Sequence, residues 1–445
     1  MRLRLVRKDL AIEAGCEGNR GPSVAMKPIR LPISPLHWLA LLCLSVWSGA
    51  ARAELKVSSD FEGGSGVVEK LDPEARVVQL MPGGDPQRGW PCWWFVRVDG
   101  LGKDEKLTIN LGGSTRPARN NGQDTGKPIA AGWAQPMRAA VSSDREHWAQ
   151  SEPGRREKNR LLYQVTGTGG PLWIAWGPPF TPQDTEALIG RMEKALSAAK
   201  GFELSQTNEK RPVRGVRVNE STAAAPRGVW VQARQHAWES GGSWVARGFA
   251  EWLASDDAEA RWVRANAEVV IVPIMDVDNV VTGNGGKEAA PRDHNRDWDD
   301  HPIHPEVTAA QQRLREWAGA GRLDLFLELH NPGYSDLRPF FFAGPEDLLA
   351  AVGQQNRADF LKLAVKHVSD PLAVEDKIRI TGPSYHPLWR QISTQWVTDH
   401  GNPQTVAMCL ETAWNTAHSN TEGYLTVGRQ LGLTIAEYLR EHPKP

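Results

Sequence analysis

The chain has 445 residues, of which 40% are apolar, and this is enough for two or three domains with packed cores. Its 52 basic residues are balanced by 53 acidic ones, which excludes a nucleic-acid-binding protein that works through a cationic surface. Only four cysteines are present, which excludes a scaffold held together by disulfides.

The N-terminal segment has the pattern of an export signal. Residues 26–30 are cationic, residues 36–47 are an apolar run too short to cross a bilayer comfortably, and residues 51–53 form a small-residue cleavage pattern. We therefore expect a mature chain that begins at Glu54, is periplasmic or secreted, and is not stably inserted in a membrane. An uncleaved membrane anchor is the alternative. The polar residues 1–25 are interpreted as an extension upstream of the true start.

Removal of this segment leaves two cysteines, Cys92 and Cys409. One disulfide between them is open in an oxidising compartment, but the apolar run around Cys409 favours a buried free thiol. The sequence does not decide between the two states.

Residues 54–180 are predicted to form an antiparallel β-sandwich domain. Short runs rich in aromatic and β-branched residues are bounded by Gly, Pro, Asp and Asn, and no helix-length periodic stretch interrupts them. The clearest strands are residues 93–100, 106–113, 161–167 and 171–177. The charged stretch around His147 is interpreted as a solvated loop, so this domain offers no catalytic cluster.

Residues 181–445 change to alternating strands and helices. Helices are expected at residues 181–200, 243–255, 305–319, 345–367 and 421–440, and strands at 228–235, 268–275, 323–329, around 341 and at 405–411. The strands are nearly continuous apolar runs, which is typical of an α/β sheet covered by helices on both faces. The predicted parts of the chain are therefore an extension with its signal peptide (1–53), a β-sandwich (54–180) and an α/β domain (181–445).

Polar side chains follow four of these strands at the point where each strand ends. His236 follows the first strand, His330 follows residues 323–329, and Glu411 ends the strand at 405–411. Asp276 and Asp278 follow the strand at 268–275. Ligands bind at the carboxyl ends of strands in open α/β sheets, so we expect a shared site at this edge.

The stretch RQHAWESGG contributes two candidate metal ligands. His236 and Glu239, with His330, supply two imidazole nitrogens and one carboxylate, which is the ligand set of a catalytic zinc site with a fourth position left for water. Glu411, preceded by an apolar strand, is the best candidate for a general base beside them. The alternative for each residue alone is an ordinary polar side chain where a strand meets a loop.

A second polar cluster spans residues 292–304. Asn295 and Arg296 offer adjacent amide and guanidinium donors, which suit a substrate carboxylate. A second metal site that uses His301 and His304 is another interpretation, but a solvated loop before a helix is favoured for those two residues.

With these residues in place, the chain resembles the zinc carboxypeptidases of the carboxypeptidase A superfamily. Four motifs occur in order: HAWE at 236–239, DHNRDW at 293–298, ELHNP around His330 and LETAW at 410–414. They look like the family's H-x-x-E, D-x-N-R-x-W, third-ligand and catalytic-glutamate segments. A preceding β-sandwich is similar to the cytosolic-carboxypeptidase branch. The resemblance implies a mixed, largely parallel sheet flanked by helices.

The resemblance also implies roles at the metal site. One zinc ion is expected, bound by His236, Glu239 and His330, with Glu411 as general base and acid. Asp293 matches the acid that hydrogen-bonds a zinc histidine, an arrangement that fixes the orientation of the ligand.

The substrate side of the family pattern is less complete. The resemblance assigns Asn295 and Arg296 to the C-terminal carboxylate of a peptide. The arginine that polarises the scissile carbonyl is missing, and Lys287 or Arg292 is expected to replace it. Tyr385 is the candidate for a tyrosine that caps the substrate, although core packing or a loop contact explains it equally well. Loss of one oxyanion donor costs about 10²–10³ in rate.

We therefore predict an exported zinc metallocarboxypeptidase that hydrolyses the C-terminal peptide bond of peptides or proteins with a zinc-activated water and Glu411 as base. The alternatives are an amidase or deacylase of the same fold acting on cell-wall peptides or N-acyl amino acids, and a non-catalytic zinc-dependent peptide-binding protein. A sugar-binding protein rests only on the 19 tryptophans. The specificity pocket is expected within residues 379–405, where Arg379, Arg390 and Trp396 are candidates.

Overall fold

The structure is a computed structural model, and it describes residues 53–224 and 226–443. The predicted upstream extension and signal peptide, up to residue 52, lie outside the described residues. Within the described ranges, no helix is both long enough and apolar enough to cross a bilayer.

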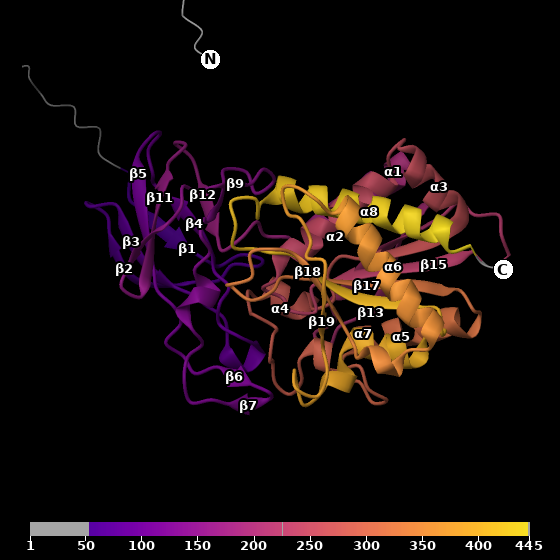
Figure 1. Cartoon of the computed structure of the whole chain (residues 1–445). Helices are drawn as coiled ribbons and strands as arrows, with labels where there is room; N and C mark the ends of the chain where they lie inside the picture. Colours follow the sequence, from indigo (N-terminus) through magenta and orange to yellow (C-terminus); the bar gives the residue numbers. More distant parts are fainter. Residues whose placement is uncertain (1–52, 225, 444–445) are drawn as a thin grey trace, which may run out of the picture. The chain divides into compact units, whose positions relative to one another are not determined.

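Two five-stranded sheets form the N-terminal sandwich (Figure 1). The first has the order β1-β4-β12-β8-β9, with bounds Lys56–Ser58, Phe95–Asp99, Leu172–Ala175, Ala140–Ser142 and Ala149–Gln150. The second has the order β10-β11-β5-β3-β2, with bounds Arg155–Glu157, Arg160–Thr166, Lys106–Leu111, Val77–Met81 and Val67–Asp72. The hairpin of β6 (Arg119–Asn120) and β7 (Gln123–Asp124) is separate. Pairing is antiparallel except between β3 and β5, which are parallel.

The sandwich core is made of alternate side chains of its strands. In β5, Leu107, Ile109 and Leu111 are buried and the residues between them are not, because successive side chains of a strand point to opposite faces of the sheet. Trp94 and Tyr163 are also fully enclosed, with ring centroids 6.0 Å apart. The strands that were predicted from their aromatic and β-branched residues therefore form a core in which alternate side chains are buried.

The second part of the chain contains an eight-stranded mixed sheet in the order β13-β14-β16-β15-β17-β20-β18-β19. The strands are Ala199–Gln206, Pro212–Asn219, Ala267–Val272, Arg227–Ala233, Leu323–His330, Val406–Glu411, Phe340–Ala343 and Ile378–Ile380 in that order. The central strands β16, β15, β17 and β20 are parallel to one another. β13, β14 and β16 pair antiparallel, and β18 runs antiparallel to β20. The sheet is thus largely parallel at its centre, as the resemblance implied.

Helices cover both faces of this sheet. They are α1 (Pro182–Ala195), α2 (Ser240–Leu253), α3 (Ala258–Asn266), the short α4 (Val277–Val281), α5 (Pro305–Gly319), α6 (Ala351–His367), α7 (Ser393–His400) and α8 (Thr421–Glu441). Figure 1 shows α2, α6 and α8 on one side of the sheet and α5 and α7 on the other. β17 and β20 are consequently buried along their whole length, which is why both read as continuous apolar runs.

Two helices begin where local signals predicted. Thr181 caps α1, and its backbone N–H donates to Asp184 Oδ2 at 2.7 Å in a capping box. α5 begins at Pro305, whose missing N–H has no intrahelical partner to lose at the first turn.

Other elements differ from the prediction. The hairpin of β13 and β14 and the helices α3 and α7 are not predicted by the sequence, because these segments are short or mix exposed and buried positions without a clear period. α2 begins at Ser240, three residues before the predicted start, since Gly241 and Gly242 are helical despite their low propensity.

Both cysteines of the predicted mature chain are buried and free. Cys92 lies in the sandwich and Cys409 on β20. The disulfide that the sequence left open is therefore not formed in this structure.

Candidate metal and peptidase site

The candidate site lies at the carboxyl ends of the central parallel strands. His330 ends β17 and Glu411 ends β20, and the two residues are directly paired in the register of these neighbouring strands. His236 and Glu239 lie in the loop between β15 and α2. The structure therefore brings four of the predicted site residues to one edge of the sheet.

His236, Glu239 and His330 form a buried cluster that suits a metal ion. One donor atom from each lies within 4.8 Å of the others. The Nδ1 atom of His236 is 2.9 Å from Glu239 Oε1, and Nδ1 of His330 contacts Glu239 Oε2. All three side chains are at most 3% exposed. Two Nδ1 atoms and one carboxylate thus converge on one point.

The opposite nitrogen of each histidine faces a second carboxylate. Nε2 of His236 lies 3.2 Å from Asp293 Oδ1, and Nε2 of His330 lies 3.0 Å from Glu328 Oε1. A carboxylate that accepts the Nε2–H leaves the Nδ1 lone pair free for a metal. The donor set and its supports therefore fit zinc, which favours imidazole nitrogen and carboxylate oxygen.

Glu328 was not among the predicted site residues. It lies two residues before His330 on a strand that is otherwise apolar apart from Asp324, and its carboxylate also accepts hydrogen bonds from Gln235 and Ser393. A carboxylate in a fully buried strand was the signal available in the sequence, because such a group needs partners that hold its charge.

The loop that carries His236 and Glu239 is shaped by Arg234. This residue has a left-handed φ of 63° and turns the chain away from β15. Its buried guanidinium donates to the carbonyl oxygens of Ala237 and Phe180, and burial lowers its pKa to about 9. Arg234 thus fixes the backbone between the two candidate ligands, His236 and Glu239.

Glu411 has the features of a base in a desolvated site. Its side chain is 8% exposed, and its Oε2 has no hydrogen-bond partner among the described residues. Burial raises its pKa to about 7, with a further upward contribution from Glu239 and opposing ones from His330 and Lys287. A carboxyl group that titrates near neutrality can both accept and return a proton.

The two candidates for the missing cation are placed differently. Arg292 forms ion pairs with Asp297 and Asp299 at 2.9 and 2.8 Å, so its guanidinium is engaged away from the metal cluster. Lys287 interacts electrostatically with Glu239 and Glu411. Burial lowers the pKa of Lys287, but Tyr385 and Glu239 outweigh this and raise it above the ordinary value. Of the two candidates, Lys287 is therefore the cation that interacts with the carboxylates of the candidate site.

Asn295 and Arg296 are buried beside the cluster, but they do not face the same partners. The Nδ2 of Asn295 is 3.3 Å from His330 Nε2, and its Oδ1 accepts from the backbone of Ser393 at 3.0 Å. Arg296 donates to its neighbour's carbonyl, and its Nε has no partner among the described residues. Its guanidinium carbon is 6.0 Å from the ring centroid of Tyr385. Arg296 and Tyr385 thus lie together, whereas the amide of Asn295 lies between His330 and Ser393.

The three candidates for a specificity pocket are already engaged. Arg379 pairs with Asp336 and Glu375 and stacks on the Phe340 ring, 3.4 Å from its centroid. Arg390 is exposed and lies over Trp389, whereas Trp396 is buried against Trp298. None of these contacts assigns a preference for a terminal side chain.

A second group, His294, His304 and Glu306, also brings potential ligands together. The two imidazoles are stacked with ring centroids 3.7 Å apart, so their in-plane nitrogens do not converge on a point. Burial lowers the pKa of His294, but Asp276 and Glu306 outweigh it and raise the pKa to about 9. We interpret this group as a buried ion cluster. His304 is half-buried in it, whereas the predicted loop was solvated, and His301 is exposed.

The acids after β16 do not join the metal cluster. Asp276 caps α4 and lies 3.6 Å from His294, and Asp278 accepts from Thr207 and pairs with Arg211. Of the four strand ends predicted to contribute to the site, the end of β16 therefore supplies carboxylates that cap a helix and form ion pairs instead.

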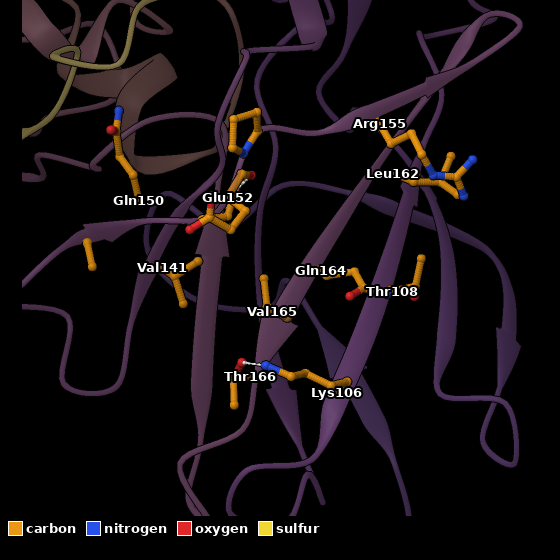
Figure 2. A pocket seen from close by; sticks show the side chains of 13 residues that line it. Lys106, Thr108, Val141, Gln150, Glu152, Arg155, Leu162, Gln164, Val165 and Thr166 are labelled. Carbon is orange, nitrogen blue, oxygen red and sulfur yellow. Dashed lines mark hydrogen bonds between the residues drawn. The ribbon is translucent and has the colours of Figure 1, made fainter.

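A hollow of about 690 Å³ lies in the sandwich, far from these residues in the chain (Figure 2). Its lining includes Lys106, Thr108, Glu152 and Arg155, and Lys106 donates to Thr166 at 2.7 Å. The described residues that line it include no aromatic ring, histidine or cysteine. No tryptophan of the described ranges is exposed, so neither observation favours a protein that stacks sugars on tryptophan.

Comparison with known proteins gives a consistent assignment. A family model described as zinc carboxypeptidase matches residues 186–412. An uncharacterized protein of Zymomonas mobilis is 26% identical over 298 residues, which cover 66% of this chain and 71% of that protein. Human cytosolic carboxypeptidase 4 is 33% identical over 117 residues, which cover 26% of this chain and 10% of that much longer protein.

Two solved structures share the fold over most of the chain. A metallo-carboxypeptidase from Burkholderia cenocepacia superposes with a TM-score of 0.71 at 21% identity and covers 87% of this chain and 100% of that one. A Pseudomonas aeruginosa metallo-carboxypeptidase in complex with (2-guanidinoethylmercapto)succinic acid gives 0.69 at 20% identity, with 87% and 99% covered. The family model spans half of the chain and includes every strand end of the cluster, so the chain belongs to the zinc carboxypeptidase family of hydrolases.

Proposed function

We propose that this zinc carboxypeptidase hydrolyses the C-terminal peptide bond of peptides or proteins, with Glu411 as the general base and acid. One observation carries the proposal: the Nδ1 atoms of His236 and His330 and the carboxylate of Glu239 converge beside a buried glutamate with a free oxygen. When bound there, zinc supplies Lewis-acid chemistry, which polarises a carbonyl oxygen and lowers the pKa of water.

Side chains of the protein itself transfer the proton, stabilise the developing charge and orient the histidines. Glu411 accepts a proton from the attacking water at its free Oε2 and returns it to the leaving amine. Lys287 faces the negative charge that develops on the carbonyl oxygen, where a fixed cation lowers the barrier. Asp293 and Glu328 keep the two histidines oriented.

Arg296 is the group that would select a free C-terminal carboxylate. Its Nε is buried and lacks a partner among the described residues, and a guanidinium binds a carboxylate in a bidentate manner. Tyr385, at 41% exposure beside it, would close over the bound terminus. Asn295 is the second candidate for binding this carboxylate, and its amide lies beside His330.

The test is a peptide library with varied C-terminal residues, digested with and without a chelator and repeated with Glu411→Gln. Each peptide is offered with a free and with an amidated C-terminus, and muropeptides and N-acyl amino acids are added as separate arms. We expect chelator-sensitive loss of the terminal residue from free-acid peptides only. Cleavage confined to muropeptides or N-acyl amino acids would instead establish an amidase or deacylase. Tight zinc binding without turnover of any substrate would establish a non-catalytic binding protein.

We further propose that the enzyme acts in the periplasm or as a secreted protein. This rests on the cationic, apolar and small-residue pattern of residues 26–53.

A further inference from the structure

The loop that carries Lys287, residues 285–290, is bonded to a segment of the β-sandwich, residues 87–90. Three backbone hydrogen bonds join them: Trp90 N–H to Lys287 O at 2.9 Å, Gly286 N–H to Arg88 O at 2.9 Å, and Ala290 N–H to Gln87 O at 2.7 Å. The conformation of the Lys287 loop therefore depends on a part of the chain that lies about 200 residues earlier in the sequence.

The two segments pack so closely that side chains are excluded between them. A Cβ atom on Gly89 would lie 2.3 Å from Gly286 N, and a Cβ on Gly286 would lie 2.6 Å from Ala237 N. Both glycines have positive φ angles, 113° and 77°. The backbone of the sandwich is thus stacked, through Gly286, on the loop between the ligands His236 and Glu239.

Trp90 gives Lys287 a defined position. The Nζ of Lys287 is 5.5 Å from the ring centroid of Trp90, within the range of a cation–π interaction. The ring is itself held, because its Nε1–H donates to Arg119 O at 2.8 Å and it makes a T-shaped contact with Trp133, with ring centroids 4.8 Å apart.

The neighbouring Glu288 bonds the Lys287 loop to two other segments, the turn between β6 and β7 and the residue Asp293. Its Oε2 accepts from the backbone of Gly122 at 3.0 Å, in the turn between β6 and β7. Its own backbone N–H donates to Asp293 Oδ2 at 2.8 Å, and Asp293 supports His236.

We propose that the β-sandwich completes the catalytic site, with Trp90 as the positioning residue that holds the Lys287 ammonium toward the substrate carbonyl. The proposal rests on the role assigned to Lys287 in the proposed peptidase. It gives the sandwich a task in the reaction that its own residues, which contain no catalytic cluster, do not suggest.

The test compares Trp90→Leu with Trp90→Phe in the full chain, using the best peptide from the library. Trp173→Leu is the matched control, because Trp173 is a half-buried sandwich tryptophan with Arg97 5.5 Å from its ring centroid, outside the site. We expect Trp90→Leu to lower kcat about tenfold with little change in KM and zinc content, Trp90→Phe to restore most of the loss, and Trp173→Leu to have no effect on kcat.

A double-mutant cycle identifies the residue through which Trp90 acts. If it acts through Lys287, then Trp90→Leu costs nothing further in a Lys287→Met background. An equal loss of kcat in both backgrounds, or an equal loss in the Trp173→Leu control, would overturn the proposal.

A second readout does not depend on turnover. In the zinc-free protein, amide hydrogen exchange of residues 285–290 should become faster in Trp90→Leu and stay unchanged in Trp173→Leu. Unchanged exchange in both variants would show that Trp90 does not hold the loop. A wild-type protein that cleaves no peptide would overturn the proposed function, and the exchange result would still decide whether the sandwich orders the Lys287 loop.

Discussion

Three glutamates of the site show how neighbours decide the chemistry of one side-chain type. Glu239 and Glu328 are buried, which raises a carboxyl pKa, but facing histidines outweigh this and hold both pKa values below the ordinary range. Glu411 is also buried, and there desolvation prevails and raises the pKa to about 7. The first two are suited to remain anionic supports and ligands, and the third is suited to exchange a proton.

The Glu411→Gln substitution should remove the general base while it preserves size. We expect kcat to fall about 10²–10⁴-fold, which is the range for a general acid–base residue, with zinc content unchanged by elemental analysis. A variant that keeps near-full activity would contradict the assignment of the base.

Activity should fall on the acid side as Glu411 becomes protonated. Only the carboxylate can accept a proton, and its pKa is raised to about 7 by burial, so kcat/KM should decline below neutral pH and be flat above it. A bound cation favours the carboxylate, which moves this decline to lower pH in the zinc-loaded enzyme. The measurement is kcat/KM across a range from acidic to mildly alkaline pH at constant ionic strength, and a rate that rises on acidification would exclude a carboxylate base.

Glu328→Gln should weaken zinc binding, because an uncharged amide supports the Nε2–H of His330 less well. Loss of such outer partners typically lowers metal affinity about 10–100-fold. Zinc affinity is measured by competition with a chromophoric chelator. Glu306→Gln is the matched control, since Glu306 is also buried and contacts a histidine, His294, at 2.6 Å. Equal weakening in both variants would show that Glu328 has no special relation to the metal.

At the scale of elements, α2 is positioned by its glycines. Gly242 lies against the end of β17, and a Cβ there would be 2.6 Å from Leu329 O. This close approach puts the start of the helix, directly after Glu239, beside His330. Glycine has a low helix propensity, but at this position it allows the candidate ligands Glu239, before α2, and His330, at the end of β17, to lie side by side.

Gly242→Ala should accordingly destabilise the protein by about 1–3 kcal/mol through overpacking. Gly190→Ala in α1 is the control, because Gly190 is exposed and a Cβ added there would meet no atom within 4 Å; it should stabilise by about 0.5–1 kcal/mol. Urea unfolding of the zinc-free proteins measures both. Opposite shifts of the midpoint are expected, and a neutral Gly242→Ala would show that α2 moves away from β17 without cost.

At the scale of the whole molecule, the sandwich and the α/β sheet share an aromatic boundary next to the ligands. Trp238, between His236 and Glu239, packs against Trp133 and Trp176 of the sandwich, with ring centroids 5.8 and 5.1 Å apart. Trp176 also packs against Trp414, which lies shortly after Glu411, with ring centroids 4.3 Å apart. Many of the tryptophans thus join the two parts of the chain, and they do so where the site is built.

The whole chain is expected to be exported, with removal of its N-terminal segment. If the signal is cleaved after residue 53, the mature protein should begin at Glu54. N-terminal sequencing of protein recovered from the periplasm or medium of the native host checks this. Recovery of the protein only with residues before 54 attached, in a membrane fraction, would favour the uncleaved anchor.

The sequence by itself determined the elements that have strong local signals. The apolar runs of β17 and β20, the Pro305 start of α5 and the order of the four motifs were sufficient to predict an α/β sheet with His236, Glu239, His330 and Glu411 at one edge, because strand direction alone brings the ends of parallel strands together.

Only the tertiary structure decided which polar side chains face the cluster. Arg292 pairs with the nearby Asp297, and Glu328 pairs with His330 two residues further along the same strand. The contact of Asn295 with His330, in contrast, joins residues 35 positions apart in the chain. The hold of residues 87–90 on the Lys287 loop is of the same kind. Such contacts depend on side-chain direction and backbone approach across elements, and hydrophobic periodicity contains no information about either.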